Sequence, residues 1–364
     1  MPKNIVICCD GTSNAPTTAR TNVLKLWLSL ERDEQQLAYY DPGVGATADR
    51  SLVTGIGRRV GRMIDFAAGT GLRDNVLGAY RLLMRIWDDG DRIFLFGFSR
   101  GAYTVRALSG LMQVFGLAET AQDNLVEYMW HVYSNKGGTP SAFERRMRVA
   151  AELRQFNRRP RVHFLGAWDT VSSWGLYFNF ASLPYTASCP RIDHIRHAVA
   201  IDERRSSFKQ NLFNPVRNND LQEVWFPGGH GDVGGGHPEE AAGLSKLALE
   251  WMLSEARGLG LRVRSTKHKK YLGRANRAGR TQYSTPDPCA PMHAGLRGLW
   301  WVLEYTPRLV WDGAMGRKGL AVNAGRRREF RPLGSAVHLS VGERFRAMGY
   351  APHGIVDTGN DSLS

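Results

Sequence analysis

The sequence has few cysteines and no long apolar run. Its four cysteines, Cys8, Cys9, Cys189 and Cys289, form neither a CxxC pair nor the spacing of a zinc motif. No stretch approaches the roughly 20 apolar residues of a membrane-spanning helix. The opening MPKNIVICCDG is too short in apolar length for a signal peptide. We therefore expect a protein that is made soluble in the reducing cytoplasm and that needs a dedicated machine for any export.

Acidic residues are outnumbered, because 48 lysines and arginines face 34 aspartates and glutamates, giving a net charge of +14. Such a charge suits an anionic partner, whether nucleic acid, acidic lipid headgroups or a phosphorylated substrate. The basic residues are scattered, however. Their denser clusters, such as 154–161 and 325–331, are not interleaved with the aromatic residues of a surface that binds single-stranded nucleic acid. We expect no nucleic-acid partner.

What is present is an alternation of buried strands and amphipathic helices. Continuous apolar runs that end in turn or polar residues predict strands within 4–11, 37–45, 92–99, 161–171 and 221–228. Helical spacing appears at 22–30, 72–87, 101–117 and 238–256. This alternation predicts an α/β fold with a mostly parallel sheet and helices on both faces.

The domain organisation follows from where this alternation stops. We predict a catalytic domain over 1–258, with insertions around 46–68, 118–160 and 174–220. Residues 259–364 form a basic, glycine-rich extension of unassigned fold, which we expect to pack on the catalytic domain.

The strongest chemical signal is GFSRG at Gly97–Gly101, a G-x-S-x-G motif between a predicted strand and a predicted helix. This context is the one that a nucleophile elbow requires, with Ser99 on the turn and Gly97 and Gly101 leaving room for strand and helix to approach. The start of the helix directs amide groups and a partial positive charge at the site. An ordinary strand–helix turn is the alternative.

A nucleophilic serine needs a base, and the order of the chain supplies candidates. Asp169 follows the predicted strand at 161–168, and His230 follows the strand at 221–226. Ser99, Asp169 and His230 thus occur in the order serine, acid, histidine of the α/β hydrolases, each at the carboxyl end of a strand. Asp169 could instead cap the turn beside Thr170.

The segment FPGGHGDVGGGH (226–237) has two further interpretations. His230, Asp232 and His237 could ligate a metal together with Asp10, although their spacing fits no metal signature. The segment could also be a purely structural turn. In the hydrolase interpretation, Asp232 follows the base closely and would brace the glycine loop. The hydrolase interpretation needs no metal and no cofactor.

The segment CCDGTSN (8–14) follows the first predicted strand. A phosphatase of the haloacid-dehalogenase type is excluded, because its nucleophilic aspartate would fall on Cys8. We interpret the segment as one side of an oxyanion hole, in which the amide of Arg100 acts with an amide of Gly11 or Thr12. Asp10 would support this loop, and a plain Asp-Gly turn is the alternative.

Seven segments together resemble the DUF2235 family, the α/β-hydrolase domain of Tle1-like type VI secretion phospholipase effectors. They are CDGTSN, YYDPGVG, GTGLRDNVLGAYRLL, GFSRGAYTVRALSGL, GAWDTVSSWG, HAVAIDERRSSF and WFPGGHGDVGGG, in order over about residues 4–256. The resemblance implies an α/β-hydrolase fold with Ser99 as nucleophile, Asp169 as acid and His230 as base. It also implies a phospholipid substrate, export by a type VI system, and a secretion adaptor or immunity protein as partner.

The resulting hypothesis is a serine hydrolase that cleaves carboxylic esters, foremost a phospholipase of A1 or A2 type. Aromatic segments at 174–185 and 295–311 would suit a peripheral membrane surface, and core packing is their alternative. A soluble carboxylesterase with the same triad and a non-catalytic scaffold that binds an anion remain as rival functions.

Overall fold

A computed structural model describes residues 2–11, 20–43, 70–135, 140–171, 183–215, 220–275, 283–298, 300–312, 317–328 and 335–352. Seven strands form one sheet in the order β2-β1-β3-β4-β5-β6-β9, and every neighbouring pair is parallel. The strands are β1 (Asn4–Cys9), β2 (Gln36–Asp41), β3 (Arg92–Phe98), β4 (Val162–Trp168), β5 (Ile192–Ala200), β6 (Leu221–Phe226) and β9 (Ser335–Val337).

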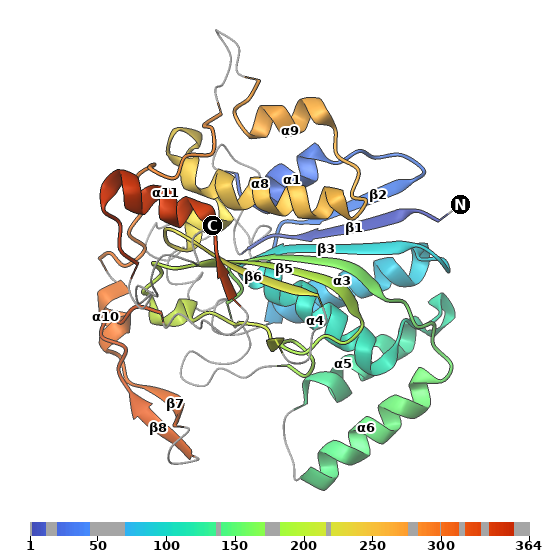
Figure 1. Ribbon diagram of the computed structural model, residues 1–364. Coiled ribbons are helices and arrows are strands. Elements are labelled where there is room, and N and C mark those ends of the chain that lie inside the picture. Colours follow the sequence, from blue (N-terminus) through green and yellow to red (C-terminus); the bar gives the residue numbers. More distant parts are fainter. Residues whose placement is uncertain are drawn as a thin grey trace, which may run out of the picture.

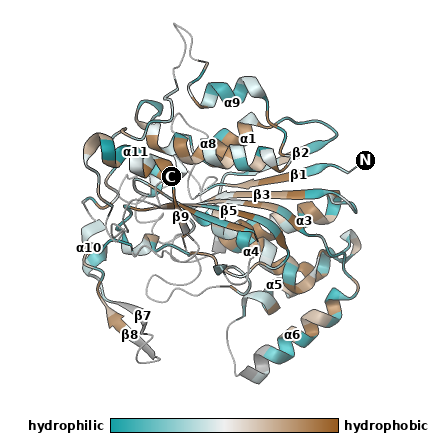
Figure 2. Ribbon diagram, in the orientation of Figure 1, coloured by the Kyte–Doolittle hydropathy of each residue, from teal (hydrophilic) through white to brown (hydrophobic). Residues whose placement is uncertain are grey.

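Helices cover both faces of the sheet (Figure 1). One face carries α1 (Asn22–Ser29), α8 (Gly243–Gly258) and α9 (Ser265–Tyr271). The other carries α3 (Thr70–Ile86), α4 (Arg100–Phe115), α5 (Val126–Ser134) and α6 (Pro140–Arg154). The central strands are apolar along most of their length (Figure 2), because parallel strands are buried on both sides. The predicted α/β class, with a parallel sheet between two helical layers, is confirmed.

Most predicted elements form close to their expected bounds, but β5 did not stand out in the sequence. Its sequence IDHIRHAVA places four polar residues, Asp193, His194, Arg196 and His197, within the strand. They interrupt the apolar run by which a buried strand is recognised. The expected insertion at 46–68 lies outside the described residues.

The C-terminal extension contributes to the main sheet. After α9, its elements are α10 (Trp300–Tyr305), the hairpin of β7 (Arg308–Asp312) and β8 (Arg317–Ala321), strand β9, and α11 (Leu339–Met348). Strand β9 pairs with β6 and thereby covers its outer edge. These elements gather at the side of the molecule toward which the sheet strands run (Figure 1). The predicted domain boundary at 258 stays a prediction. In the part of the chain that the structure describes, no helix is long and apolar enough to cross a membrane.

Candidate active site

The register of the sheet places the predicted site residues at one edge. Cys9 pairs with Gly97, and Phe98 pairs with Trp168, so Asp10, Ser99 and Asp169 each follow the carboxyl end of a neighbouring strand. In the order β2-β1-β3, the strand that follows β1 in the chain lies on one side of it, and the next strand lies on the other side. The chain connections thus diverge at the carboxyl end of β1. Ligands of open α/β sheets bind at such points.

Ser99 occupies the turn between β3 and α4 with a positive φ of 58°, a strained conformation for a residue other than glycine. Two glycines make this turn sterically feasible. A Cβ on Gly97 would lie 2.4 Å from the carbonyl oxygen of Gly101, and a Cβ on Gly101 would lie 2.0 Å from that of Cys9. The sharp strand–helix turn expected of a nucleophile elbow is therefore present.

Asp169 and His230 are brought together from different strands. His230 begins the short helix α7 (His230–Gly234) after β6, and its Nδ1 lies 2.6 Å from Oδ2 of Asp169. The Ala200 amide donates to the other oxygen, Oδ1, at 3.0 Å. Asp169 has a φ of 38°, so the turn after β4 is strained as the turn at Ser99 is.

Two aromatic rings fix the plane of the imidazole. The ring of Phe98 lies 4.6 Å from that of His230, and the ring of Phe208 packs edge-on at 4.8 Å. Phe98 directly precedes Ser99, so the histidine lies beside the elbow. Among the described residues no hydrogen bond joins Ser99 to His230. Such contacts are often long in a free enzyme and tighten when the substrate binds.

Burial lowers the pKa of His230 below its ordinary value, and the opposing charge of Asp169 does not fully restore it. The imidazole is therefore neutral at neutral pH and can accept a proton. Burial alone would raise the pKa of Asp169, but Arg328 and His230 outweigh it and hold that pKa well below its usual range. The pair thus consists of a neutral base and a permanently charged carboxylate.

Arg328 of the C-terminal extension forms an ion pair with Asp169 through two nitrogens. The guanidinium lies 2.5 Å from Oδ1 and 3.0 Å from Oδ2. It also donates to the carbonyl oxygens of Ala200 and Phe208. Its side chain is only 4% exposed. A charged hydrogen bond with this geometry is stronger than one between neutral groups and fixes the orientation of the carboxylate.

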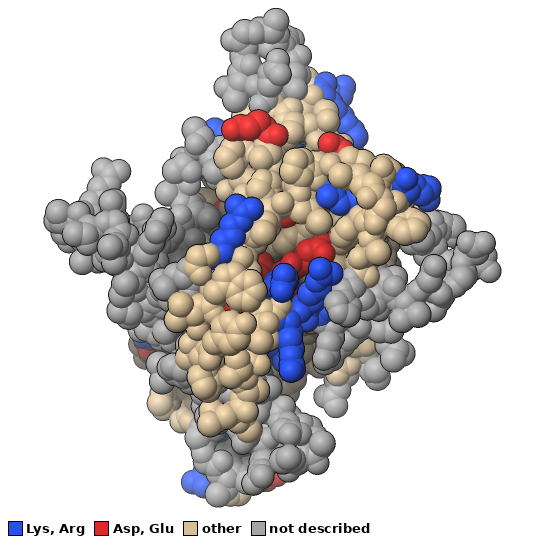
Figure 3. Space-filling view, turned by 90° about the vertical axis from the view of Figure 1, so that its left-hand side faces the viewer, with Lys and Arg blue, Asp and Glu red and all other residues tan. Residues whose placement is uncertain are grey.

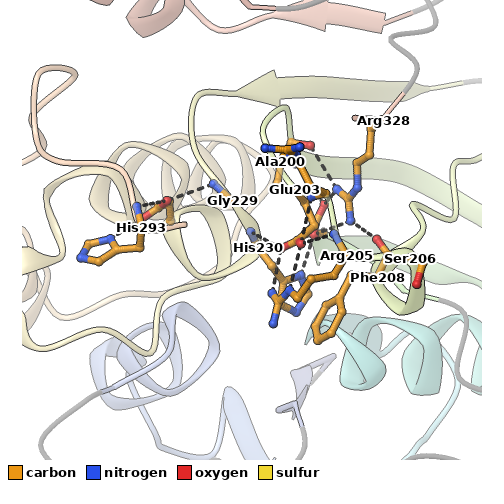
Figure 4. Close-up of polar contacts among 12 residues, drawn as sticks. Ala200, Glu203, Arg205, Ser206, Phe208, Gly229, His230, His293 and Arg328 are labelled. Atoms are coloured by element: carbon orange, nitrogen blue, oxygen red, sulfur yellow. Dashed lines mark hydrogen bonds and ion pairs between the residues drawn. The ribbon is translucent and has the colours of Figure 1, made fainter. Parts of the chain in front are cut away.

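Glu203 contacts the backbone of His230 and so supports this residue (Figure 4). Its buried carboxylate accepts the backbone amide of His230 at 3.2 Å and pairs with Arg205 at 2.7 Å. Burial would raise the pKa of Glu203, but Arg205 lowers it to about 2. The Arg205 guanidinium lies 3.6 Å above the Phe208 ring, so this ion pair also positions the aromatic wall of His230.

Asp10 holds the loop after β1. Its carboxylate accepts the Tyr40 hydroxyl at 2.8 Å, the Thr21 hydroxyl and, at 2.7 Å, the Gly11 amide. Since Gly11 already donates to Asp10, it would have to release that carboxylate before it could bind an oxyanion. Thr12 lies outside the described residues. Arg100 begins α4 directly after Ser99, where the prediction placed its amide.

Of the four residues considered for a metal, the structure brings two together. His230 bonds to Asp169, and Asp10 accepts from Gly11, Thr21 and Tyr40. Neither belongs to the group of possible metal ligands around Asp232. Asp232 lies 3.6 Å from Nε2 of His237 and 2.6 Å from Nδ1 of His293. Asp232 also accepts the Gly229 amide at 2.9 Å.

Four residues of the site were not predicted from the sequence. Glu203, Arg205 and Phe208 lie within HAVAIDERRSSF, a segment that carried the family resemblance but no assigned role. Arg328 lies in a basic cluster of the extension, and the charge pattern of this cluster does not indicate that Asp169 is its partner.

Comparison with known proteins identifies the family. Residues 3–255, more than half of the chain, match the catalytic domain of the Tle1-like phospholipase effectors of the type VI secretion system. The chain belongs to this family. It is the family that the seven sequence segments resemble.

Two individual proteins are also similar to this chain. An uncharacterized protein of Saccharomyces cerevisiae is 34% identical over 227 residues, which cover 59% of this chain and 33% of the yeast protein. A crystal structure of an uncharacterized protein from Pseudomonas aeruginosa is 19% identical with a TM-score of 0.42, and the match covers 72% of this chain and 46% of that protein. The chain thus spans about a third of the length of the curated yeast relative.

Proposed function

We propose that the protein is a serine phospholipase that cleaves a carboxylic ester bond of membrane glycerophospholipids. The observation that carries the proposal is the hydrogen bond of 2.6 Å between His230 and Asp169, beside a serine on a strained strand–helix turn. Family membership supports the substrate class.

In the proposed reaction, His230 removes the proton of the Ser99 hydroxyl as its oxygen attacks the ester carbonyl. Asp169 holds the imidazole in the required tautomer and stabilises its charged form. His230 then donates that proton to the leaving alcohol, and an acyl group remains on Ser99. A water molecule, deprotonated by His230, attacks the acyl-enzyme and releases the fatty acid.

The tetrahedral intermediates carry a negative oxygen that needs donors already in place. We assign this role to the amide of Arg100 and to the amide of Gly11 or Thr12, of which Gly11 must first release the Asp10 carboxylate. Both follow strands that are adjacent in the sheet. Loss of one such donor typically lowers the rate by roughly 10²–10³.

The surface around α10 suits a lipid interface. Val302 and Tyr305 on α10 are each 61% exposed, and Leu320 on β8 is 76% exposed. Exposed arginines, Arg326 and Arg327, follow in the sequence. Apolar and aromatic residues beside arginines favour binding to an anionic membrane.

This surface is linked to the base through two ring contacts. The Trp300 ring at the start of α10 packs edge-on against Phe208 at 5.6 Å, and Phe208 packs against His230. Figure 3, a view from the side of the extension, shows acidic side chains in a hollow with basic side chains beside them. We propose that a phospholipid reaches Ser99 from this side.

The proposal is tested by fatty-acid release from vesicles of mixed-acyl phosphatidylcholine and phosphatidylglycerol. We expect release by the wild type and by the control Ser254→Ala, an exposed serine of α8, but not by Ser99→Ala. The acyl chain released distinguishes A1 from A2 specificity. No release by the wild type would contradict the proposal, and turnover of soluble esters alone would identify a carboxylesterase.

The role of the α10 surface is tested separately. We expect the double variant Val302→Ser and Tyr305→Ser to release less fatty acid from vesicles while hydrolysing a short soluble ester at the wild-type rate. Equal loss on both substrates would show that α10 serves the fold rather than the interface.

A further inference from the structure

We propose that Asp232, His237 and His293 form a binding site for one divalent transition-metal ion of the zinc class. The three residues come from different segments: Asp232 from α7, His237 from the loop before α8, and His293 from the C-terminal extension. This site is distinct from the proposed triad, since no residue is shared between them.

The ligand atoms are already close to one another. One atom from each residue lies within 4.8 Å of both others. Oδ1 of Asp232 is 2.6 Å from Nδ1 of His293 and 3.6 Å from Nε2 of His237. Ligands on a tetrahedral zinc ion, with bonds of about 2.0–2.1 Å, lie roughly 3.3 Å apart. The two distances from Oδ1 of Asp232 thus differ from this spacing by less than an ångström.

The aspartate is oriented by other contacts. Its Oδ2 accepts the backbone amides of Gly229 at 2.9 Å and His293 at 3.0 Å (Figure 4). These bonds leave Oδ1 to face the two imidazoles. Hydrogen bonds that fix a ligating carboxylate in this way are typical of metal sites.

The two imidazole rings are stacked, with centroids 3.8 Å apart and an angle of 18° between their planes. Only the His293 ring lies within hydrogen-bond distance of Oδ1, because 3.6 Å is too long for His237. One ion can bond both nitrogens and the carboxylate once the rings turn out of this stack, because the lone pair of each nitrogen lies in the plane of its ring. Two imidazoles and one carboxylate form a ligand set suited to zinc and its neighbours in the transition series.

A glycine allows this approach. A Cβ on Gly231 would lie 2.5 Å from Nε2 of His237, in the space that the imidazole occupies. The dense glycines of the segment thus serve two neighbouring sites, since the same loop delivers His230 to Asp169.

Burial and charge are compatible with an ion. The Asp232 side chain is 1% exposed, whereas those of His237 and His293 are 27% and 30% exposed, so solvent can reach the open coordination position. Two nearby cations each have a carboxylate partner: Lys25 lies 2.7 Å from Glu239, and Arg205 lies 2.7 Å from Glu203.

The ion would fasten the extension to the helix of the base. Asp232 follows His230 by two residues on α7, and His293 belongs to the described segment 283–298. We assign the ion a structural role and no step of ester hydrolysis. The inference does not rest on the proposed function, because metal binding can be measured on the inactive Ser99→Ala variant.

The test is a zinc titration of the full chain after removal of metals with a chelator. A competing chromophoric chelator reports stoichiometry and affinity. We expect one ion per chain in the wild type and in His131→Ala, whose exposed histidine on α5 serves as the matched control. We expect at least roughly tenfold weaker binding in His237→Ala and in His293→Ala, as for loss of groups around a metal.

A second measurement covers the case in which these variants fold poorly. Cobalt bound to the wild type in a site of low coordination number gives visible absorption bands far stronger than those of the aqueous ion. We expect these bands, and their loss when zinc is added. Absence of stoichiometric zinc binding and of these bands in the wild type would overturn the inference. An equal loss of affinity in His131→Ala would indicate adventitious binding to surface histidines and would overturn it as well.

Discussion

The guanidinium of Arg328 is held against the carboxylate of Asp169 at 2.5 and 3.0 Å, and neither side chain is more than 4% exposed. The acid of the proposed triad therefore has two partners, His230 on one side and a permanent cation on the other. Because the arginine offsets part of the aspartate's charge, it also limits how strongly Asp169 can stabilise the imidazolium. The ion pair of Arg328 and Asp169 should thus set the position of the Asp169 carboxylate and the pH range in which His230 is neutral.

Substitutions of Arg328 can separate its effect on the position of Asp169 from its effect on the pKa of His230. We expect Arg328→Met to lower kcat/KM roughly 10- to 100-fold, the kinetic equivalent of about 1.5–3 kcal/mol for hydrogen bonds to a charged group. The acid limb of the pH–rate profile should move to higher pH, since an unopposed Asp169 raises the pKa of His230. Arg328→Lys keeps the charge but not the two-point contact, so its rate should fall while its acid limb stays in place. An unshifted limb in Arg328→Met would leave Arg328 with a purely structural role.

The pH dependence of the wild type follows from the neutral base. The pKa of His230 lies below its ordinary value of about 6.5, mainly because of burial. Hydrolysis requires the neutral imidazole, so kcat/KM should be constant around neutrality and should fall as the pH drops through that pKa. The acid limb should therefore lie below pH ~6.5. A profile of kcat/KM on a soluble ester measures it, and a limb above that value would contradict the assignment.

Substitutions at glycine test the geometry of the elbow. A Cβ at position 101 would lie 2.0 Å from a backbone oxygen of β1, so strand and helix must move apart. We expect Gly101→Ala to destabilise the fold by about 1–3 kcal/mol or more, as overpacking does, and to abolish hydrolysis. Gly78 in α3 is the matched control, because its Cβ would meet nothing within 4 Å. Gly78→Ala should raise the free energy of unfolding by about 0.5–1 kcal/mol. Urea unfolding compares the two variants directly.

Glu203 should stabilise the fold in a pH-dependent manner. Its folded-state pKa of about 2 lies below the ordinary value of 4.5. The stabilisation is therefore complete above about pH 4.5 and is lost as the pH falls toward 2. We expect Glu203→Gln to cost on the order of 2–4 kcal/mol at pH 7 and much less near the acid end. The exposed Glu152→Gln on α6 should change little at either pH. A constant difference between Glu203→Gln and the wild type across this range would contradict the linkage.

The sequence was sufficient to predict those parts of the fold that depend on local pattern. Buried parallel strands are uniformly apolar, so β1, β3 and β4 could be recognised, and the elbow has a motif that requires both of its neighbours. Strand β5 could not be recognised, because His194 and Arg196 contact Asp220 as polar residues within the strand and break the apolar run.

The contacts between residues distant in the sequence could not be predicted, for a different reason. Arg328 lies 159 positions from Asp169, and His293 lies 61 positions from Asp232. Neither residue occurs in a periodic segment or a motif. Such pairs are specified by the packing of the extension on the sheet edge, which no local propensity encodes.

The position of Arg328 in the sequence has a consequence for how the protein is synthesised and folded. A ribosome that has completed β6 and α8 has supplied the serine, the acid and the base, along with nearly all of the sheet. The guanidinium that pairs with Asp169, and the strand that covers the outer edge of β6, emerge only after these elements. Assembly of the proposed site thus waits for residues beyond α8, and a chain terminated before Arg328 would contain the three proposed reactive groups without the side chain that orients the acid.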